Sequence, residues 1–443
     1  MNTAELYHHY LSAQQCISTD SRQIKPGCLF FALKGDNFDG NQFAARAIDE
    51  GAVLAIIDDP SVHLANGKTI LVNNVLETLQ TLATHHRRQF HIPIIGITGS
   101  NGKTTTKELI AGVLKTHYQT HFTRGNYNNH IGVPLTLLEM PLDTEVAVIE
   151  MGANHQGEID LLSRIAEPSH GIITNIGKAH LEGFGGIEGV KKGKSELYRF
   201  LGENRGTVFI NRDAAFLTEL AAPVANQIFY FQTKNPSLKE PGYETVLLED
   251  KPFLKVGYLD KDATLVDANT YLFGMHNFQN IMTAISIGKY FKVPAGKIKY
   301  ALENYIPSDN RSQLMDWEND NKILLDAYNA NPSSMEASLR LFASQIENRT
   351  PLAILGDMLE LGKDAAQEHL NIASLAVELL GPDHVVLVGP LFKDAAKQFN
   401  LLHFSNTPAS KQWFDAQNWS AHYFLLKGSR GIGLEKLLAV PTF

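Results

Sequence analysis

The stretch IIGITGSNGKTTTK, residues 94–107, decides the fold of this chain. It joins an apolar run, typical of the end of a buried parallel strand, to a glycine-bearing turn that ends in Gly-Lys-Thr. Gly99 and Gly102 permit backbone conformations that expose successive N–H groups, and a helix from Thr104 points its positive end at an anion. The order of strand, turn and helix predicts a phosphate-binding loop (P-loop). Lys103 would reach the β- and γ-phosphates of a nucleotide, and the Thr104 hydroxyl would reach a Mg2+ ion.

The spacing of this loop differs from the general pattern G-x-x-x-x-G-K-[ST]. The first position of that pattern falls on Ile97, and the extra glycine is Gly99. The sequence therefore indicates a narrower subfamily of phosphate loops. The alternative is a chance Gly-Asn-Gly turn before a helix, and the order of strand, turn, lysine and threonine argues against it.

Composition limits the class of protein. A length of 443 residues favours about three domains, and 44% hydrophobic residues are ample for packed cores. The net charge is −8, and no Lys/Arg-rich block is long enough to follow a nucleic-acid backbone, so we expect no nucleic-acid partner. The chain contains two cysteines, Cys16 and Cys28, which makes a disulfide framework or a thiolate metal site improbable.

The sequence contains no targeting or membrane-spanning signal. The N-terminal residues MNTAELYHHY lack a basic region followed by an apolar one, and no window approaches the ~18 apolar residues of a membrane span. We therefore expect a cytoplasmic protein with no membrane insertion, and we expect a monomer.

The order of apolar runs predicts three α/β domains, at residues 1–85, 86–307 and 308–443, with a linker around Pro307, Ser308, Asp309 and Asn310. The first is small, and the third alternates strands and helices in a Rossmann-like way. The second contains the P-loop and near-continuous apolar strands of a parallel sheet. Residues 246–273 look antiparallel and would form an edge of that sheet. The strands expected in the central sheet are residues 92–98, 146–151, 170–176 and 207–211.

Two residues follow strands of the central sheet at its carboxyl edge, where open parallel sheets bind ligands. Glu150 closes the strand VAVIE beside the P-loop strand, so its carboxylate would hold the metal that Thr104 also touches. His180 lies in the Gly-rich loop KAHLEGFGG after the strand HGIIT and is a candidate ligand. The alternatives are a helix cap or surface acid for Glu150 and a structural histidine for His180.

The segment GVKKGKSELYRF carries three lysines, and a chemical modification of one of them, Lys194, is a specific hypothesis. A lysine beside bound cations can react with carbon dioxide to give a carbamate, an anion that bridges two Mg2+ ions, whereas an ammonium would repel them. The plain alternative is a solvated helix face on which Lys194 pairs with Glu196.

Three further clusters are rich in amides and charges, and turn formation is the plain alternative for each. That alternative is strong for the cluster in DAYNANP and weaker for the pair in FGMHNFQN, because a helical pattern continues there and amide pairs suit recognition of an adenine edge. The clusters are Asn126, Asn128 and Asn129; Asn277 and Asn280; and Asp326, Asn329 and Asn331.

The chain resembles the Mur ligases, and within them the MurF type, along nearly its whole length. The motifs TGSNGKTTTKE, NYNNHIGVPLTLL, EMGANHQGEI, AHLEGFG, GMHNFQN, DAYNANPSSM, LGDMLELG and LLKGSR occur in that family's order, and STDSR, GCLFFALKG and FDG resemble its UDP-binding domain. The loop fingerprint alone is shared with folylpolyglutamate synthetases. The Asp-Asn-Pro-Arg motif expected of the MurE type is absent from the chain.

The resemblance implies a UDP-sugar-peptide domain, a central ATPase domain and a mobile C-terminal ligase domain. It also implies roles for individual residues. Lys103, Lys194 and His180 would be catalytic. Thr104, Glu150, His180 and a carbamylated Lys194 would bind Mg2+, and two ions are expected. The ATP site would comprise Gly99, Ser100, Asn101, Gly102, Lys103, Thr104, Thr105, Asn277, Asn280, Arg311 and Asp326. The substrate-binding residues would be Ser21, Arg22, Asn128, Asn129, Lys427, Ser429 and Arg430.

The reaction so implied is the ATP-dependent joining of D-alanyl-D-alanine to UDP-N-acetylmuramoyl-tripeptide through an acyl phosphate, in peptidoglycan precursor synthesis. Two alternatives stay open at this point. One is a nucleotide-dependent switch or motor with the same loop, which the set of metal-site residues and the separate UDP-type domain argue against. The other is a sibling amide ligase of the MurE or folylpolyglutamate type.

Overall fold

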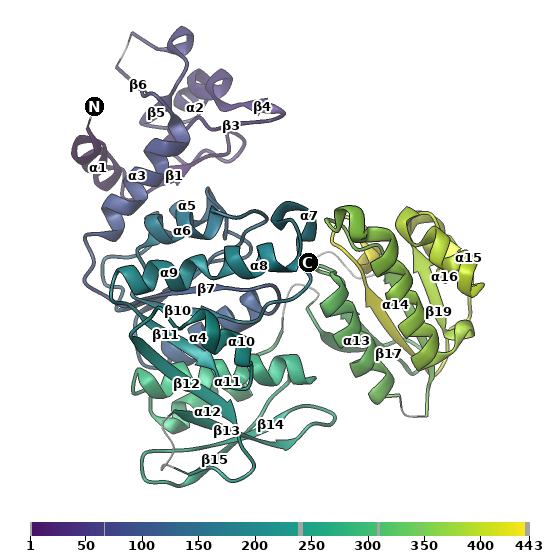
Figure 1. Ribbon diagram of the computed structural model, residues 1–443. Helices are drawn as coiled ribbons and strands as arrows, with labels where there is room; N and C mark the ends of the chain where they lie inside the picture. Colours follow the sequence, from purple (N-terminus) through teal and green to yellow (C-terminus); the bar gives the residue numbers. More distant parts are fainter. Residues whose placement is uncertain (1, 66, 238–241, 308–310, 347, 439–443) are drawn as a thin grey trace.

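The computed structural model describes residues 2–65, 67–237, 242–307, 311–346 and 348–438. It consists of three α/β bodies, each built on its own sheet, which confirms the predicted fold class (Figure 1). The three linker residues Ser308, Asp309 and Asn310 lie outside the described residues. Among the described helices, none combines the length and apolar character needed to cross a bilayer.

The N-terminal body has a four-stranded parallel sheet in the order β1-β2-β5-β6 and a two-stranded hairpin β3-β4. Its elements are α1 Thr3–Ser12, β1 Ile17–Ser18, β2 Leu29–Phe31, β3 Lys34–Gly35, β4 Phe38–Asp39, α2 Ala44–Asp49, β5 Leu54–Ile57, β6 Thr69–Leu71 and α3 Val75–Arg87.

The predicted boundary at residue 85 lies within α3. This helix packs against α5 and α6 of the central body. Its last turn is hydrogen-bonded there, because the Thr84 hydroxyl donates to the Ile165 carbonyl at 3.2 Å and Arg87 Nε donates to the Ala166 carbonyl at 3.0 Å. The chain therefore passes from the first body to the second through a helix anchored on the second.

The central body has a nine-stranded sheet in the order β15-β14-β13-β12-β11-β10-β7-β9-β8. Strands β7 to β13 pair in parallel, and β13, β14 and β15 form the antiparallel edge that the sequence predicts. The elements are β7 Ile94–Thr98, α4 Lys103–Lys115, β8 Thr120–Phe122, α5 Gly132–Leu138, β9 Val146–Glu150, α6 Glu158–Ala166, β10 His170–Ile173, α7 Leu181–Phe184, α8 Ile187–Lys194, α9 Glu196–Glu203, β11 Thr207–Asn211, α10 Ala215–Leu220, β12 Asn226–Gln232, β13 Tyr243–Glu249, β14 Lys255–Leu259, β15 Leu265–Asn269, α11 Met275–Tyr290 and α12 Ala295–Glu303.

The C-terminal body has a six-stranded sheet in the order β16-β17-β21-β18-β19-β20, in which only β16 is antiparallel. It lies beside the central body, next to α7 (Figure 1). The elements are β16 Gln313–Trp317, β17 Asn321–Asp326, α13 Pro332–Ser344, β18 Thr350–Gly356, α14 Ala365–Leu380, β19 Val385–Val388, α15 Lys393–Phe399, β20 Leu402–Phe404, α16 Thr407–Asp415 and β21 His422–Lys427.

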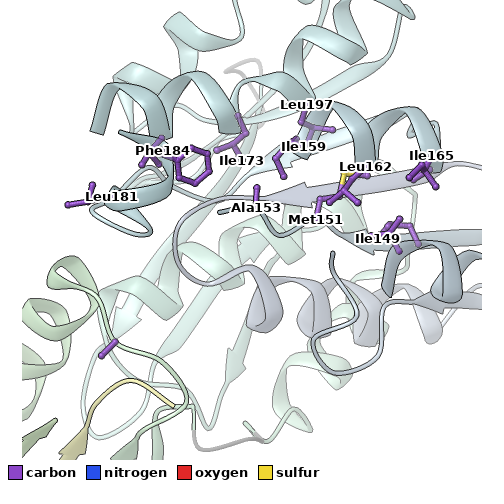
Figure 2. Packing of buried hydrophobic residues seen from close by; sticks show 14 of the residues in the cluster. Ile149, Met151, Ala153, Ile159, Leu162, Ile165, Ile173, Leu181, Phe184 and Leu197 are labelled. Atoms are coloured by element: carbon purple, nitrogen blue, oxygen red, sulfur yellow. The ribbon is translucent and has the colours of Figure 1, made fainter. Parts of the chain in front are cut away.

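The central sheet is buried on both faces, which explains why its strands read as continuous apolar runs. Figure 2 shows one face, where Ile149 and Met151 pack with Ile159 of α6. Val148 points the other way, into the core that α4 and α11 cover. This two-sided packing fixes the position at which β9 ends, and its last residue, Glu150, is buried at the carboxyl edge of the sheet.

Candidate active site

The P-loop strand β7 lies between β10 and β9 in the sheet. Because the three strands are parallel, their carboxyl ends meet at one edge. The residues that follow them, the P-loop after β7, Glu150 at the end of β9 and residues 174–180 after β10, therefore face the same space. This juxtaposition confirms that Glu150 stands beside the loop, as the strand order implies.

The P-loop, residues 99–105, uses its two glycines where the backbone requires them. Gly99 has φ +142° and Gly102 has φ +77°, a region that other residues rarely adopt. A Cβ on Gly99 would lie 2.0 Å from Thr174 Oγ1, and one on Gly102 would lie 2.7 Å from Asn280 Oδ1. Both glycines are thus needed for close approach to neighbouring strands and helices as well as for conformation.

Lys103 begins α4 and folds back over the loop. Its Nζ donates to the carbonyls of Gly99, at 2.8 Å, and Ser100, at 3.2 Å. Burial lowers the pKa of Lys103, and the Arg311 guanidinium lowers it further, whereas Glu150 opposes the shift. The ammonium is therefore held inside the loop, at the place where phosphate oxygens would replace carbonyls as its partners.

The loop after β10 holds the P-loop from the side. The N–H of Asn101 donates to Asn175 Oδ1 at 3.0 Å, and the carbonyl of Asn101 accepts from Thr174 Oγ1 at 2.7 Å. Ser100 and Gly177 exchange two further hydrogen bonds. Sequence reasoning missed Asn175, although its place after a strand adjacent to β7 was a usable signal.

Glu150 is the central acidic group of the site. Its Oε1 accepts from Asn128 Nδ2 at 2.7 Å and from the Thr104 hydroxyl at 3.3 Å. Its Oε2 is buried and accepts no hydrogen bond, and Lys107 Nζ lies 3.5 Å away. A buried carboxylate oxygen without a donor, next to a threonine hydroxyl, suits a hard cation that also binds phosphate oxygens.

No ready-made metal cluster of three or more His, Cys, Asp or Glu side chains exists in the part of the chain that the structure describes. His180 has a left-handed backbone, φ +52°, and its Nδ1 lies 2.5 Å from Oε2 of Glu360 in the C-terminal body. The side chain of His180 thus links two bodies at the cavity rim. Glu150 and Thr104 therefore offer oxygen ligands for a cation here, and a bound nucleotide would add others.

Lys194, at the end of α8, is almost completely buried. Its Nζ donates to the Ala153 carbonyl at 3.2 Å and lies 5.0 Å from the ring centre of Phe184. Burial, and secondarily the Lys103 ammonium, holds the pKa of Lys194 well below its usual range, while Glu158 and Glu196 oppose the shift.

Glu196 interacts with the start of α6. Its carboxylate accepts the backbone N–H groups of Gly157, at 2.7 Å, and Asp160, at 3.0 Å, at the start of α6. This arrangement satisfies donors that a helix leaves unpaired in its first turn and places a negative charge at its positive end. The carboxylate is thus occupied at α6 and does not need Lys194 as a partner.

Asn277 and Asn280 lie on α11, one turn apart, and both are buried. Asn280 Nδ2 donates to Asn277 Oδ1 at 3.1 Å, and Asn280 Oδ1 accepts from the Thr106 hydroxyl of α4 at 3.0 Å. Asn277 Nδ2 donates to the Phe273 carbonyl. The pair therefore joins α11 to the P-loop helix, and both residues line a cavity between the P-loop and the C-terminal body.

The C-terminal body forms the wall of this cavity that faces the P-loop. Asp326 ends β17, and its Oδ2 accepts from Lys427 Nζ at 2.6 Å and from the Ser338 hydroxyl at 2.7 Å. Burial raises the pKa of Asp326, but Lys427 outweighs that effect, so the pKa lies below its ordinary value. His276, which the sequence did not single out, faces this pair, and burial lowers its pKa.

Arg311 and Arg430 both approach the ring of Tyr328. The guanidinium of Arg311 lies 3.5 Å from the ring centre and that of Arg430 lies 5.4 Å away. The Nε of Arg311 is buried without a hydrogen-bond partner. Ser429 is buried, and its hydroxyl bonds to the backbone of Leu359 and Ala330, so it connects three loops of this body.

A cavity of about 770 Å³ lies between the P-loop and the C-terminal body. Most of the predicted ATP and metal residues line it, whereas Gly99, Lys194, Ser429 and Arg430 are not among its lining residues. Ser21 and Arg22 are in the N-terminal body, where Arg22 is exposed and donates to the Asp20 carboxylate from two guanidinium nitrogens and its backbone N–H. The predicted residues on the lining are Ser100, Asn101, Gly102, Lys103, Thr104, Thr105, Asn128, Asn129, Glu150, His180, Asn277, Asn280, Arg311, Asp326 and Lys427.

Family models match the three bodies in order. They are described as the Mur ligase family, catalytic domain, at residues 14–87; the Mur ligase middle domain, at residues 97–288; and the Mur ligase, glutamate ligase domain, at residues 310–420. One solved MurF structure from Acinetobacter baumannii superposes with a TM-score of 0.84 at 30% identity and 97% coverage of each chain. The folylpolyglutamate synthase of Thermotoga maritima, at 14% identity and a TM-score of 0.59, shares the fold alone; the match covers 83% of this chain and 93% of that one.

Two curated relatives extend the comparison along the sequence. The UDP-N-acetylmuramoyl-tripeptide–D-alanyl-D-alanine ligase of Bacillus subtilis is 35% identical over 95% of this chain and 92% of its own length. The enzyme of the same name from Synechocystis is 36% identical over 84% of this chain and 78% of its own length. The chain therefore belongs to the Mur ligase family and, within it, to the MurF type.

Proposed function

We propose that this protein is an ATP-dependent amide ligase that joins D-alanyl-D-alanine to UDP-N-acetylmuramoyl-tripeptide in peptidoglycan precursor synthesis. The observation that carries the proposal is the cavity in which the P-loop faces Asp326, Arg311 and Lys427 of the C-terminal body. Relatives that bear this activity in their names match nearly the whole chain. We further propose that the domains are residues 1–85, 86–307 and 308–443, and that the protein acts in the cytoplasm as a monomer.

ATP is proposed to bind with its phosphates on residues 99–105. Lys103 would exchange its carbonyl contacts for phosphate oxygens, and Asn277 and Asn280 would face the base. Arg311 and Asp326 would reach the ribose from the linker and the C-terminal body. The buried nitrogen of Arg311 that lacks a partner supports a ligand at that position.

Magnesium is proposed to bind at Glu150 and Thr104, with His180 at the rim. The orphaned Oε2 of Glu150 beside the Thr104 hydroxyl fits a cation. The ion would neutralise charge on the transferring phosphoryl group. We propose that Lys194 carries a carbamate, which would add an anionic ligand. Its burial against the Ala153 carbonyl, together with the hydrogen bonds that occupy the carboxylate of Glu196 at α6, supports a role other than a surface ion pair.

The proposed chemistry follows from the poor reactivity of a carboxylate. ATP would phosphorylate the terminal carboxylate of the UDP-linked tripeptide, which gives an acyl phosphate with a good leaving group, and the amine of D-alanyl-D-alanine would then attack the carbonyl carbon. Phosphoryl transfer needs positioning and electrostatic stabilisation more than covalent help from the protein. Lys103 would stabilise charge on the phosphates, and the C-terminal body would exclude water from the acyl phosphate.

The substrates are proposed to approach from two sides. Ser21 and Arg22 would bind the uridine part on the N-terminal body. Asn128 and Asn129 would lie under the peptide near Glu150, since both line the cavity. Lys427, Ser429 and Arg430 would flank the phosphates or the incoming dipeptide; the bonds of Ser429 to backbone atoms support a part in shaping this loop.

Phosphate release by the purified protein tests this proposal. With ATP, Mg2+, UDP-tripeptide and D-alanyl-D-alanine, release should be rapid and should match the amount of UDP-pentapeptide seen by mass spectrometry. Omission of either peptide substrate should suppress it. Rapid ATP hydrolysis that ignores both substrates would favour a nucleotide-dependent switch. Product formation with a single amino acid in place of the dipeptide would favour a sibling ligase.

A further inference from the structure

The first turn of α13 in the C-terminal body touches the P-loop of the central body through one side chain. Asn331 is the N-cap of α13, and its Oδ1 accepts from the Ser334 N–H at 2.9 Å. The other end of the same carboxamide, Nδ2, donates to Asn101 Oδ1 at 2.7 Å. Asn331 is buried and Asn101 is partly exposed, so the contact lies at the wall of the cavity. A single amide therefore fixes a helix start and a P-loop residue at once.

The contact reaches a part of the loop that is otherwise held by the central body alone. The backbone N–H and carbonyl of Asn101 are already bonded to Asn175 and Thr174. The side-chain oxygen of Asn101 accepts the hydrogen bond from Asn331 Nδ2. The C-terminal body thus adds the last constraint on the conformation of Asn101.

A second bond shows that the two bodies are closely packed at this point. The Lys178 N–H donates to the Ser333 hydroxyl at 3.1 Å. A Cβ on Gly177 would lie 3.0 Å from the same hydroxyl oxygen. Because side chains cannot shift freely in such packing, a movement of α13 changes the surroundings of the P-loop.

We propose that Asn331 is a positioning residue through which the placement of the C-terminal body controls the grip of the P-loop on nucleotide phosphates. This inference rests on the proposed function, because it takes the P-loop ligand to be ATP. The inference goes beyond that function because it couples the docking of α13 to the ordering of Asn101. Linkage makes the coupling reciprocal, so a bound nucleotide also favours the docked C-terminal body.

The substitution Asn331→Ser separates the two roles of the side chain. Serine caps helices as well as asparagine does, but it is too short to donate to Asn101. The matched control is Asn406→Ser, since Asn406 is also the N-cap of a helix in the same body with a proline in the first turn. Asn331→Thr provides a second variant that keeps a cap if the serine variant unfolds, as thermal melting will show.

The measurement is the affinity of the protein for a fluorescent ATP analogue, together with the KM for ATP in the ligase assay. Loss of one neutral hydrogen bond should weaken binding about 3- to 10-fold. Asn331→Ser should show this loss, and Asn406→Ser should bind like the wild type. In a background of Asn101→Ala, replacement of Asn331 should have no further effect, because the acceptor is already gone.

Two results would overturn the inference. One is wild-type affinity in both Asn331 variants. The other is additivity in the double-mutant cycle, in which Asn331→Ser weakens nucleotide binding equally with and without the Asn101 side chain. Additive effects would mean that Asn331 acts only as a helix cap. Failure of the wild-type protein to bind the ATP analogue at all would instead refute the proposed function.

Discussion

Replacement of Lys427 by methionine should destabilise the C-terminal body, because it removes the cation from the carboxylate of Asp326, whose side chain is 16% exposed. Lys427 is 2% exposed, and its Nζ lies 2.6 Å from Asp326 Oδ2. The Ser338 hydroxyl would remain as a donor to the same oxygen. Loss of one partner of a buried ion pair typically costs about 3–5 kcal/mol, most of it the penalty of the charge that stays behind.

The sign of the pH dependence follows from the pKa of Asp326, which Lys427 holds below its ordinary value despite burial. In the wild type, the pair therefore stabilises the fold above about pH 4, the unfolded pKa of aspartate, and this contribution is lost as pH falls through the lower folded pKa. In Lys427→Met, burial, the largest single effect, is opposed only by the Ser338 hydroxyl and His276, so the pKa of Asp326 rises. The deficit should be largest at neutral pH and should shrink at about pH 4.5, where the carboxyl becomes protonated in the folded variant.

Tryptophan fluorescence can follow this body alone, because the three tryptophans of the chain are Trp317, Trp413 and Trp419. Urea denaturation at the two pH values gives the free energy of unfolding. The matched control is Lys411→Met, which removes the partner of Asp415 at a solvent-facing pair, and it should cost at most about 1 kcal/mol. A Lys427→Met deficit no larger than that of the control, or one that grows as pH falls, would refute the reasoning.

Three further results are expected. Gly99→Ala should weaken ATP binding roughly 10-fold or more, because Gly99 has φ +142° and its new Cβ would lie 2.0 Å from Thr174 Oγ1. Gly112→Ala in α4, the helix that follows the P-loop, should bind ATP normally, because a Cβ there meets nothing within 4 Å. Equal effects of the two substitutions would remove the steric argument. Lys194→Ala should be folded and nearly inactive, and formate or acetate should restore part of the activity by supplying an anionic ligand; full activity without added acid would exclude the carbamate. Small-angle scattering should report compaction when an ATP analogue and UDP-tripeptide bind, and an unchanged radius of gyration would indicate a preformed closed site.

The sequence predicted the centre of the site because local chemistry determines it. The apolar strand, the two glycines and the Gly-Lys-Thr ending define a P-loop without reference to the rest of the chain. Glu150 was found because neighbouring parallel strands end at one edge. The same rule would have reached Asn175, which follows β10.

The contacts between bodies could not be predicted in this way. Asn331 and Asn101 lie 230 positions apart, and the plain alternative of a turn in DAYNANP predicts neither the helix cap that Asn331 forms nor its contact with Asn101. The hydrogen bonds of Glu196 with the start of α6 leave no sequence signal, because they depend on how two helices pack. The edge strands β8, β16 and β20 were also missed. β8 and β20 have three residues each, and every residue of β16 is at least partly exposed, so none of them forms a continuous buried apolar run.

The central claim is that ATP activates the peptide carboxylate as an acyl phosphate. The most direct measurement uses UDP-tripeptide labelled with 18O in its terminal carboxylate, with ATP and D-alanyl-D-alanine. One labelled oxygen should appear in the released phosphate and the other should remain in the new amide, because phosphorylation joins a carboxylate oxygen to phosphorus before the amine displaces it. Unlabelled phosphate released alongside the product would contradict the account, since the phosphoryl group would then have gone to water.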